Sequence, residues 1–285
     1  MCRTGAANIR QGMRCLAGAA AVLLVQSASA YAQRVDIAPG IASQVIIPGK
    51  TYPQGRLAWV YTPAGYPAVC RKECNLIIAF DGAMYMLAMS LPEILDSLIA
   101  VKQTPPTVAV MLDNGQGSTR ISDLGNSSRF AGFVADELLP WVRKRYAVTH
   151  SANRTTLAGA SAGGLAAAFI ALKYPSLFGN VLSQSGAYWR GNEVSSSPPY
   201  EWLTRQYETL PRADIRFFMD VGLLESGDAR DGSVPSLLDA NRNLREVLKA
   251  KGYSVEYFEV PNGEHSVNTW RTRLPAGIVS LAPIH

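Results

Sequence analysis

Short apolar runs alternate with longer stretches of mixed polarity along most of this chain. Eight runs are rich in β-branched and aromatic residues and predict strands over residues 43–47, 57–62, 75–80, 107–112, 155–160, 180–185, 215–221 and 254–260. Four longer stretches, several with apolar residues three and four positions apart, predict helices over residues 91–101, 129–146, 162–174 and 236–252. This alternation predicts an α/β fold, a mostly parallel sheet with helices on both faces. The first two strands have no helix between them and predict an antiparallel edge.

The composition is that of a globular protein. The chain has 285 residues, of which 48% are hydrophobic and 17% are charged. It therefore holds enough apolar material for a large core and too little charge for a disordered chain. No long linker, charged run or internal repeat interrupts residues 33–285, which predicts a single domain over that range.

The net charge of +5 is concentrated at the start of the chain. Arg3, Arg10 and Arg14 lie in the first 32 residues, which hold no Asp or Glu. Without them, 24 of the 27 basic residues remain against 22 acidic ones, so the rest of the chain carries only +2. No basic run with interleaved aromatic residues follows, which argues against a nucleic-acid partner.

The first 32 residues are typical of a secretory signal peptide. A basic segment precedes an apolar stretch of 11 residues, Cys15–Val25, and small residues follow at sites suited to cleavage after Ala30 or Ala32. A membrane span needs about 20 apolar residues, so this stretch is too short to remain as an anchor. We expect a periplasmic or secreted protein with no stable membrane anchor after cleavage.

Two cysteines remain in the predicted mature chain, Cys70 and Cys74. Their spacing permits a small local disulfide or two free thiols, and in an exported protein we predict the disulfide. The mature chain holds no other cysteine, and the whole chain has only three histidines, which argues against a metal site. Nothing in the sequence calls for a cofactor.

A Gly-x-Ser-x-Gly motif lies between a predicted strand and a predicted helix. Ser161 stands at its centre, with Gly159 and Gly163 on either side. In α/β sheets the reactive groups lie beyond the carboxyl ends of the strands. The glycines allow a tight turn that projects the serine, and the amides at the helix start stabilise negative charge. The motif predicts that Ser161 is a nucleophile.

A serine nucleophile needs a base, and three histidines are available. His150 precedes the strand that leads to Ser161 and so lies at the opposite end of it, roughly 20 Å or more away. His285 is the terminal residue. His265 follows the last predicted strand and therefore shares the carboxyl edge with Ser161, which makes it the predicted base.

The third catalytic residue is a carboxylate that orients the histidine. In this fold it lies between the serine and the histidine in the chain, and the loop after residues 215–221 offers Glu225, Asp228 and Asp231. We predict Glu225, which is nearest the strand end, with Asp228 as the alternative.

Two backbone amides are expected to stabilise the oxyanion. They are that of Ala162, next to the nucleophile, and that of Ala83, in the turn Asp81-Gly82-Ala83 after the strand 75–80.

Candidate substrate-binding residues lie in the loops at the same edge. Tyr188, Trp189 and Trp270 could form the walls of an aromatic acyl pocket, although each is equally suited to the core. Arg120 follows the strand 107–112 and could bind a catecholate or a carboxylate, although it is also compatible with an ordinary surface position.

The sequence resembles the putative-esterase family of α/β-hydrolases and, within it, the enterochelin (siderophore) esterases. The motifs that carry the resemblance are FDGAMY from residue 80, PPTVAVMLD from 105, ELLPWVRKRY from 137, RTTLAGASAGGLAAAFIALKYPSLFGNVLSQSGAYW from 154, DVGLLE from 220 and GEHSVNTWR from 263. The resemblance implies the α/β-hydrolase fold and the roles already given to Ser161, His265 and Glu225. Two features depart from the family: its GGHD appears as GEHS at residues 263–266, and the N-terminal domain of the cytoplasmic enterochelin esterases is missing.

The expected function is serine carboxylic-ester hydrolysis of a small-molecule substrate, with siderophore-type esters implied by the resemblance. Acyl transfer by the same three residues and hydrolysis of feruloyl or acetyl carbohydrate esters remain alternatives. A silent binding protein and a peptidase fit the intact catalytic set less well. The oligomeric state stays open.

Overall fold

The structure is a computed structural model that describes residues 37–192, 198–227 and 234–282. From Ile37 onward these residues belong to one compact unit. The predicted signal peptide, residues 1–32, lies outside the described residues. Within the described part, no helix has the length and apolar character needed to cross a membrane.

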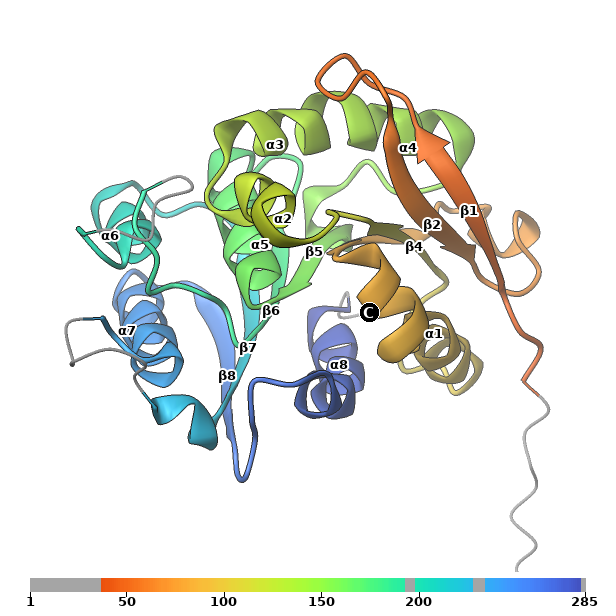
Figure 1. Cartoon of the computed structure of the whole chain (residues 1–285). Helices are drawn as coiled ribbons and strands as arrows, with labels where there is room; N and C mark the ends of the chain where they lie inside the picture. Colours follow the sequence, from red (N-terminus) through yellow and green to blue (C-terminus); the bar gives the residue numbers. More distant parts are fainter. Residues whose placement is uncertain (1–36, 193–197, 228–233, 283–285) are drawn as a thin grey trace, which may run out of the picture. The chain divides into compact units, whose positions relative to one another are not determined.

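An eight-stranded sheet forms the centre of the domain (Figure 1). The strands are β1 (Ile41–Ile47), β2 (Arg56–Thr62), β3 (Asn75–Phe80), β4 (Thr107–Leu112), β5 (Thr155–Ala160), β6 (Asn180–Gln184), β7 (Arg216–Gly222) and β8 (Ser254–Val260). Their order is β1-β2-β4-β3-β5-β6-β7-β8. β2 pairs antiparallel with β1 and β4, and every other named pair is parallel. The predicted fold class and antiparallel edge are confirmed.

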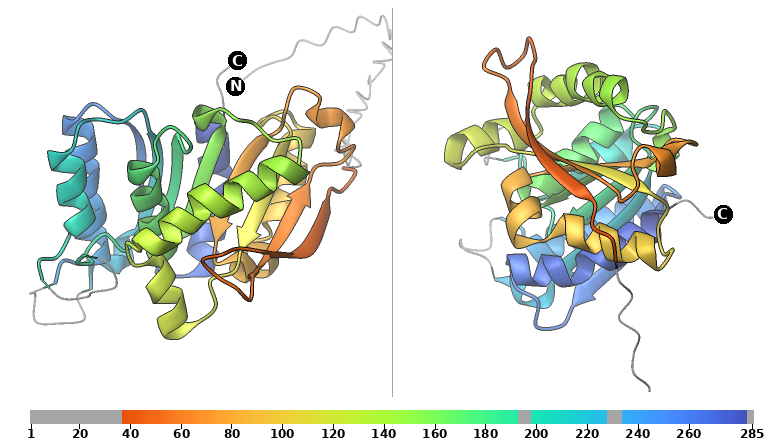
Figure 2. Two further views of the ribbon diagram at one scale, coloured as in Figure 1. Left: turned by 90° about the horizontal axis from the view of Figure 1, so that it is seen from above. Right: turned by 90° about the vertical axis from the view of Figure 1, so that its right-hand side faces the viewer.

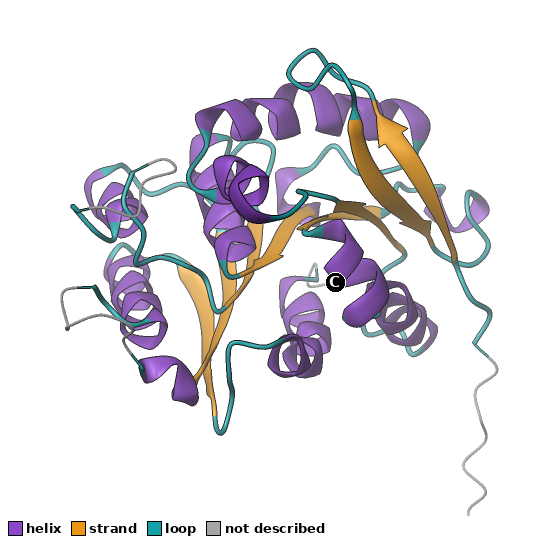
Figure 3. Cartoon of the chain, viewed as in Figure 1, coloured by secondary structure: helices purple, strands orange, loops and turns teal. Residues whose placement is uncertain are grey.

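Helices fill most of the connections between strands (Figure 3). They are α1 (Leu91–Ala100), α2 (Gly117–Leu124), α3 (Ser128–Gly132), α4 (Leu139–Arg145), α5 (Ala162–Lys173), α6 (Trp202–Thr209), α7 (Leu237–Ala250) and α8 (Val267–Leu281). A π-helical segment, η3 (Phe133–Leu138), joins α3 to α4, so the predicted helix 129–146 consists of three consecutive segments.

Three helices were not predicted: α2, α6 and α8. The first two are short and mostly polar. α8 does carry a helical pattern, since its buried residues Trp270, Leu274, Ile278 and Leu281 recur every three or four positions. Pro275 lies within this stretch, and proline disfavours a helix interior, but the helix continues through it in the structure.

The two faces of the sheet are covered by different helices (Figure 2). Side chains of β3 alternate between two apolar clusters, because successive residues of a strand point to opposite faces. Ile78 and Phe80 pack in the cluster that contains residues of α5 and α7, whereas Ile77 and Ala79 pack with residues of α1 and α8. Both clusters keep the inner strands dry, which leaves the strand ends as the places where polar groups can meet a substrate.

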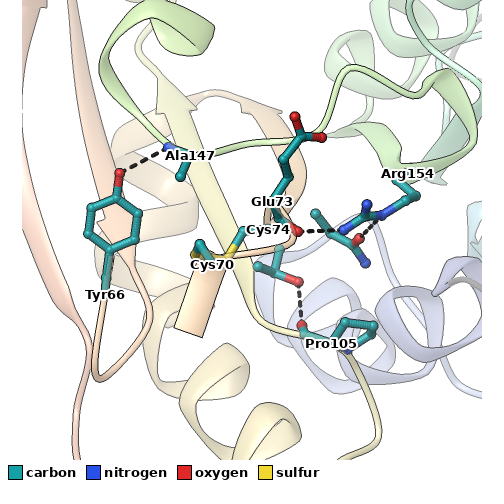
Figure 4. Close-up of a disulfide and its surroundings, with 9 residues drawn as sticks. Tyr66, Cys70, Glu73, Cys74, Pro105, Ala147 and Arg154 are labelled. Carbon is teal, nitrogen blue, oxygen red and sulfur yellow. Dashed lines mark hydrogen bonds between the residues drawn. A yellow bond between two sulfur atoms is a disulfide. The ribbon is translucent and has the colours of Figure 1, made fainter. Parts of the chain in front are cut away.

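Cys70 and Cys74 are joined by a disulfide in the structure (Figure 4). Cys74 immediately precedes β3, and its backbone bridges to the segment after α4: the Cys74 N–H donates to the Ala147 carbonyl at 2.9 Å, and the Thr149 N–H donates to the Cys74 carbonyl at 2.9 Å. The Ala147 N–H in turn donates to the Tyr66 hydroxyl at 3.0 Å. The disulfide therefore fastens the amino end of the central strand.

Replacement of both cysteines, Cys70→Ala with Cys74→Ala, should lower stability. Closing so short a loop contributes about 2 kcal/mol, which for a domain of this size corresponds to a Tm lowered by roughly 4–8 °C. Thermal denaturation followed by circular dichroism measures the shift. Reductant should lower the Tm of the parent protein but not that of the double variant, and a parent Tm unaffected by reductant contradicts the expectation.

Candidate active site

Ser161 occupies a strained turn between β5 and α5. Its backbone has φ 57° and ψ −121°. This conformation is unfavourable in free energy for any residue that has a side chain. The end of β6 and the segment after it hold Ser161 there: the Ser161 N–H donates to the Gln184 carbonyl at 2.8 Å, and the Ala187 N–H donates to the Ser161 carbonyl at 3.0 Å. The turn therefore projects the serine side chain at the carboxyl edge of the sheet.

The first glycine of the motif is required by packing. A Cβ on Gly159 would overlap the backbone of Gly163, where α5 passes over the end of β5. The helix can pass this close to the strand only because Gly159 has no side chain. The Gly-x-Ser-x-Gly spacing thus encodes the turn that the sequence predicts.

His265 and Glu225 form a direct pair. Glu225 lies in the short helix η5 (Leu223–Ser226) after β7, and His265 lies between β8 and α8. Its Nδ1 stands 2.6 Å from Glu225 Oε2. The Glu225 side chain is only 2% exposed, whereas that of His265 is 38% exposed. The two loops are also joined by the Leu224 N–H, which donates to the Gly263 carbonyl at 3.0 Å.

The other oxygen of Glu225 is bound as well. Its Oε1 accepts the Gly222 N–H at 2.8 Å and the Ser185 hydroxyl at 2.6 Å. A buried carboxylate is costly unless hydrogen bonds replace its water. Here three groups do so, and Glu225 is fixed with Oε2 toward the imidazole.

The serine, the carboxylate and the histidine follow β5, β7 and β8, so all three lie at one edge of the sheet. The end of β6 links them, because Gln184 holds the Ser161 backbone and Ser185 holds Glu225. Asp228 and His285 lie outside the described residues, as does Asp231. His150 lies before β5, at the opposite edge.

The turn after β3 lies beside the serine turn. Asp81 has φ 62°, and a Cβ on Gly163 would lie 3.4 Å from Asp81 Oδ2. Ala83 directly precedes the π-helical segment η2 (Met84–Ala88), and Ala162 is the first residue of α5. Amides at the first positions of a helix have no partner within it. The two predicted oxyanion donors are thus carried by adjacent turns.

Arg120 contacts the protein itself. Its Nε and Nη2 donate to the two carboxylate oxygens of Asp81 at 2.6 and 2.7 Å, a bidentate pair. The Asp81 N–H donates to Asn114 Oδ1 at 3.0 Å. Arg120 therefore fixes the turn that carries Ala83, a role that the sequence did not indicate.

The aromatic candidates differ in exposure. Tyr188 has no exposed surface, and its hydroxyl donates to Ser183 Oγ at 2.6 Å. It therefore belongs to the core, which corrects the expectation that it forms a pocket wall. Trp270 is 7% exposed and packs edge-on against the His265 ring, with centroids 4.9 Å apart. Trp189 is partly exposed, with the Arg190 guanidinium 5.2 Å from the centre of its ring.

Comparison with known proteins identifies the family. The sequence profile of the putative esterase family matches residues 51–281. The chain belongs to this family. The site residues described above, from Asp81 to Trp270, all lie within the matched range.

Several relatives are esterases. The iron(III) enterobactin esterase of Escherichia coli is 30% identical over 245 residues, which cover 84% of this chain and 57% of that protein. The crystal structure of the Shigella flexneri enterobactin esterase, obtained in the presence of enterobactin, has a TM-score of 0.74 at 29% identity and covers 86% of this chain and 59% of that one. An endo-1,4-beta-xylanase/feruloyl esterase of Xylanibacter ruminicola is 25% identical over 261 residues, 88% of this chain and 32% of that protein. The chain spans less than two thirds of the length of these relatives.

A second carboxylate, Asp220, lies behind the pair and was not predicted. It is fully buried on β7, and its Oδ2 accepts from Gln184 Nε2 at 3.1 Å. Burial raises its pKa to about 7; the nearby Glu225 charge adds to this, while the Gln184 hydrogen bond and the Arg273 charge oppose it. In the described part of the chain, no three His, Cys, Asp or Glu side chains are grouped to hold a metal ion.

The raised pKa of Asp220 predicts a pH-dependent stability. The folded state binds its proton more tightly than the unfolded state, where the pKa is 3.8. Stability is therefore fully present below that value and is lost as the pH rises toward 7, by up to about 1.4 kcal/mol per pH unit. Asp220→Asn removes this titration. Between pH 5 and pH 7, its unfolding free energy in urea should rise relative to the parent by roughly 1 to 3 kcal/mol. A difference that is constant over this range contradicts the expectation.

Proposed function

We propose that this chain is a serine carboxylic-ester hydrolase that works through an acyl-enzyme. The observation that carries the proposal is the 2.6 Å contact between His265 Nδ1 and the buried Glu225, at the sheet edge that presents Ser161. Glu225 accepts a hydrogen bond from Nδ1–H, so the Nε2 lone pair is left free to act as a base. Family membership supports the same reaction class.

The reaction begins when Ser161 Oγ attacks the ester carbonyl carbon while its proton passes to His265 Nε2. The carbonyl oxygen becomes an oxyanion, to which the amides of Ala83 and Ala162 donate. As the intermediate collapses, the bond from carbon to the leaving oxygen breaks, and that oxygen takes the proton from His265. Water then attacks the acyl-Ser161 ester by the same route and releases the acid.

We propose siderophore-type esters as the substrate class, because enterobactin esterases are among the relatives. Apolar surface at the catalytic edge suits an aromatic acyl group: Leu87, four residues after Ala83, is 73% exposed, and Leu224, next to Glu225, is 58% exposed. A feruloyl ester is the second candidate, which the xylanase/feruloyl esterase relative favours. Both substrates present an aromatic acyl group to the same serine.

The decisive variant is Ser161→Ala. It should fold like the parent and lose at least about 10³-fold in turnover, because no other group can form the acyl-enzyme. The assay compares ferric enterobactin, a feruloyl sugar ester and p-nitrophenyl butyrate on both proteins. A fluorophosphonate probe should label Ser161, and labelling should fall in His265→Ala.

Substantial hydrolysis by folded Ser161→Ala would refute the mechanism. If the feruloyl ester is turned over faster than ferric enterobactin, the siderophore assignment is wrong while the mechanism stands. Transfer of the acyl group to an added alcohol in preference to water would identify an acyltransferase.

We also propose that the protein is exported and acts outside the cytoplasm, on the basis of residues 1–32. Intact-mass measurement of protein expressed with its full sequence should show a chain that begins at Tyr31 or Gln33, with Cys70 and Cys74 joined in the periplasmic fraction. A product that retains Met1 would contradict export through this segment.

A further inference from the structure

Ser185 occupies an unusual position behind the catalytic pair. It directly follows β6, has no exposed surface, and adopts φ 47° without being a glycine. Its N–H donates to the Asp220 carbonyl at 2.7 Å, which holds the backbone in this conformation. Strained backbone at a strand end is typical of groups that must point in one direction.

The hydroxyl of Ser185 stands between two groups of the site. Trp270 Nε1 lies 2.9 Å from Ser185 Oγ, and Oγ lies 2.6 Å from Glu225 Oε1. An indole N–H can only donate, so Ser185 must accept from Trp270. The single hydroxyl proton is then free to go to the carboxylate. The direction of both bonds is thereby fixed.

This direction determines what Glu225 can do. With Oε1 occupied by Ser185 and by the Gly222 N–H, Oε2 is the oxygen that faces His265 Nδ1. A carboxylate held by two donors on one oxygen keeps one orientation, and its other oxygen accepts a hydrogen bond from Nδ1–H. That choice places the imidazole lone pair on Nε2, which the reaction requires.

Trp270 is fixed at both its side chain and its backbone. Its carbonyl accepts from Gln184 Nε2 at 2.7 Å, in addition to the indole bond to Ser185. Its ring meets the His265 ring edge-on at an angle of 89°. The half-exposed imidazole thus has Glu225 at one nitrogen and the indole against its ring.

We propose that Ser185 and Trp270 are positioning residues that set the orientation of Glu225 and His265 during catalysis. The proposal rests on the proposed function, because it assigns these residues to the same site. It gives Trp270 a role within the protein in place of a wall against substrate. Ser185 acts only through Glu225, whereas Trp270 acts through Ser185 and through its contact with the imidazole ring.

The test compares Ser185→Ala with Ser183→Ala. Ser183 is a matched control: it lies on β6 two residues before Ser185, is also fully buried, and its hydroxyl bonds Tyr188 instead of Glu225. With p-nitrophenyl butyrate, Ser185→Ala should lower kcat by about 10- to 100-fold at a nearly unchanged KM. Ser183→Ala should stay within about threefold of the parent kcat, even if both variants lose similar stability.

Trp270→Phe keeps an aromatic ring and deletes the N–H. Its kcat should fall between those of the two serine variants, because Ser185 can still donate to Glu225. The rate at which a fluorophosphonate labels Ser161 should follow the same order, since labelling reports the activated serine without a substrate pocket.

A double variant separates positioning from general damage. If Ser185 acts through the carboxylate, then Ser185→Ala added to Glu225→Gln should not slow turnover further. The proposal is overturned if the kcat losses of the two single variants multiply in the double variant. It is also overturned if Ser185→Ala has the same kcat as Ser183→Ala. If Ser185→Ala does not fold, a parent-like kcat in Trp270→Phe overturns it equally. Failure of the proposed function is distinct, because the parent protein itself would then neither hydrolyse the ester nor be labelled at Ser161.

Discussion

The buried carboxylate of Glu225 is the group around which the catalytic edge is built. A charge with 2% exposure is tolerated only where hydrogen bonds replace its lost water, and here they come from three separate segments. Gly222 ends β7, Ser185 directly follows β6, and His265 lies in the loop after β8. Satisfying this one group therefore fixes the relative positions of β6, β7 and the start of α8.

Strained backbone marks the same edge. Three strands that are consecutive in the sheet, β3, β5 and β6, are each followed by a non-glycine residue with positive φ: Asp81 at 62°, Ser161 at 57° and Ser185 at 47°. Each is held by bonds from another segment: Asp81 by Arg120, Ser161 by Gln184, and Ser185 by Asp220. The hydrophobic layers on both faces of the sheet stabilise the fold enough to offset this local strain.

Electrostatics divides the charged groups near the site into two kinds. Asp81 forms a bidentate ion pair with the Arg120 guanidinium, which balances its charge, and the pair holds the shape of the turn. Asp220 forms no ion pair with any described residue, and burial raises its pKa to about 7 against the opposing charge of Arg273. Below that pH the protonated Asp220 adds no second negative charge beside Glu225, so Glu225 does not have to share the buried region with another ionised carboxylate.

The sequence by itself determined the α/β class and the edge that carries the chemistry, and it predicted the disulfide and the candidate residues Ser161, His265 and Glu225. These follow from local rules: the alternation of strand and helix, a glycine pattern that permits only one kind of turn, and a count of three histidines. Tertiary structure alone decided that Arg120 binds Asp81, that Tyr188 is in the core, and that Ser185 and Trp270 stand behind Glu225. Partners 39 to 85 residues apart are brought together by strand order and loop packing. No local pattern records such pairings, because an arginine, a serine or a tryptophan has the same propensities whether it faces substrate or another side chain.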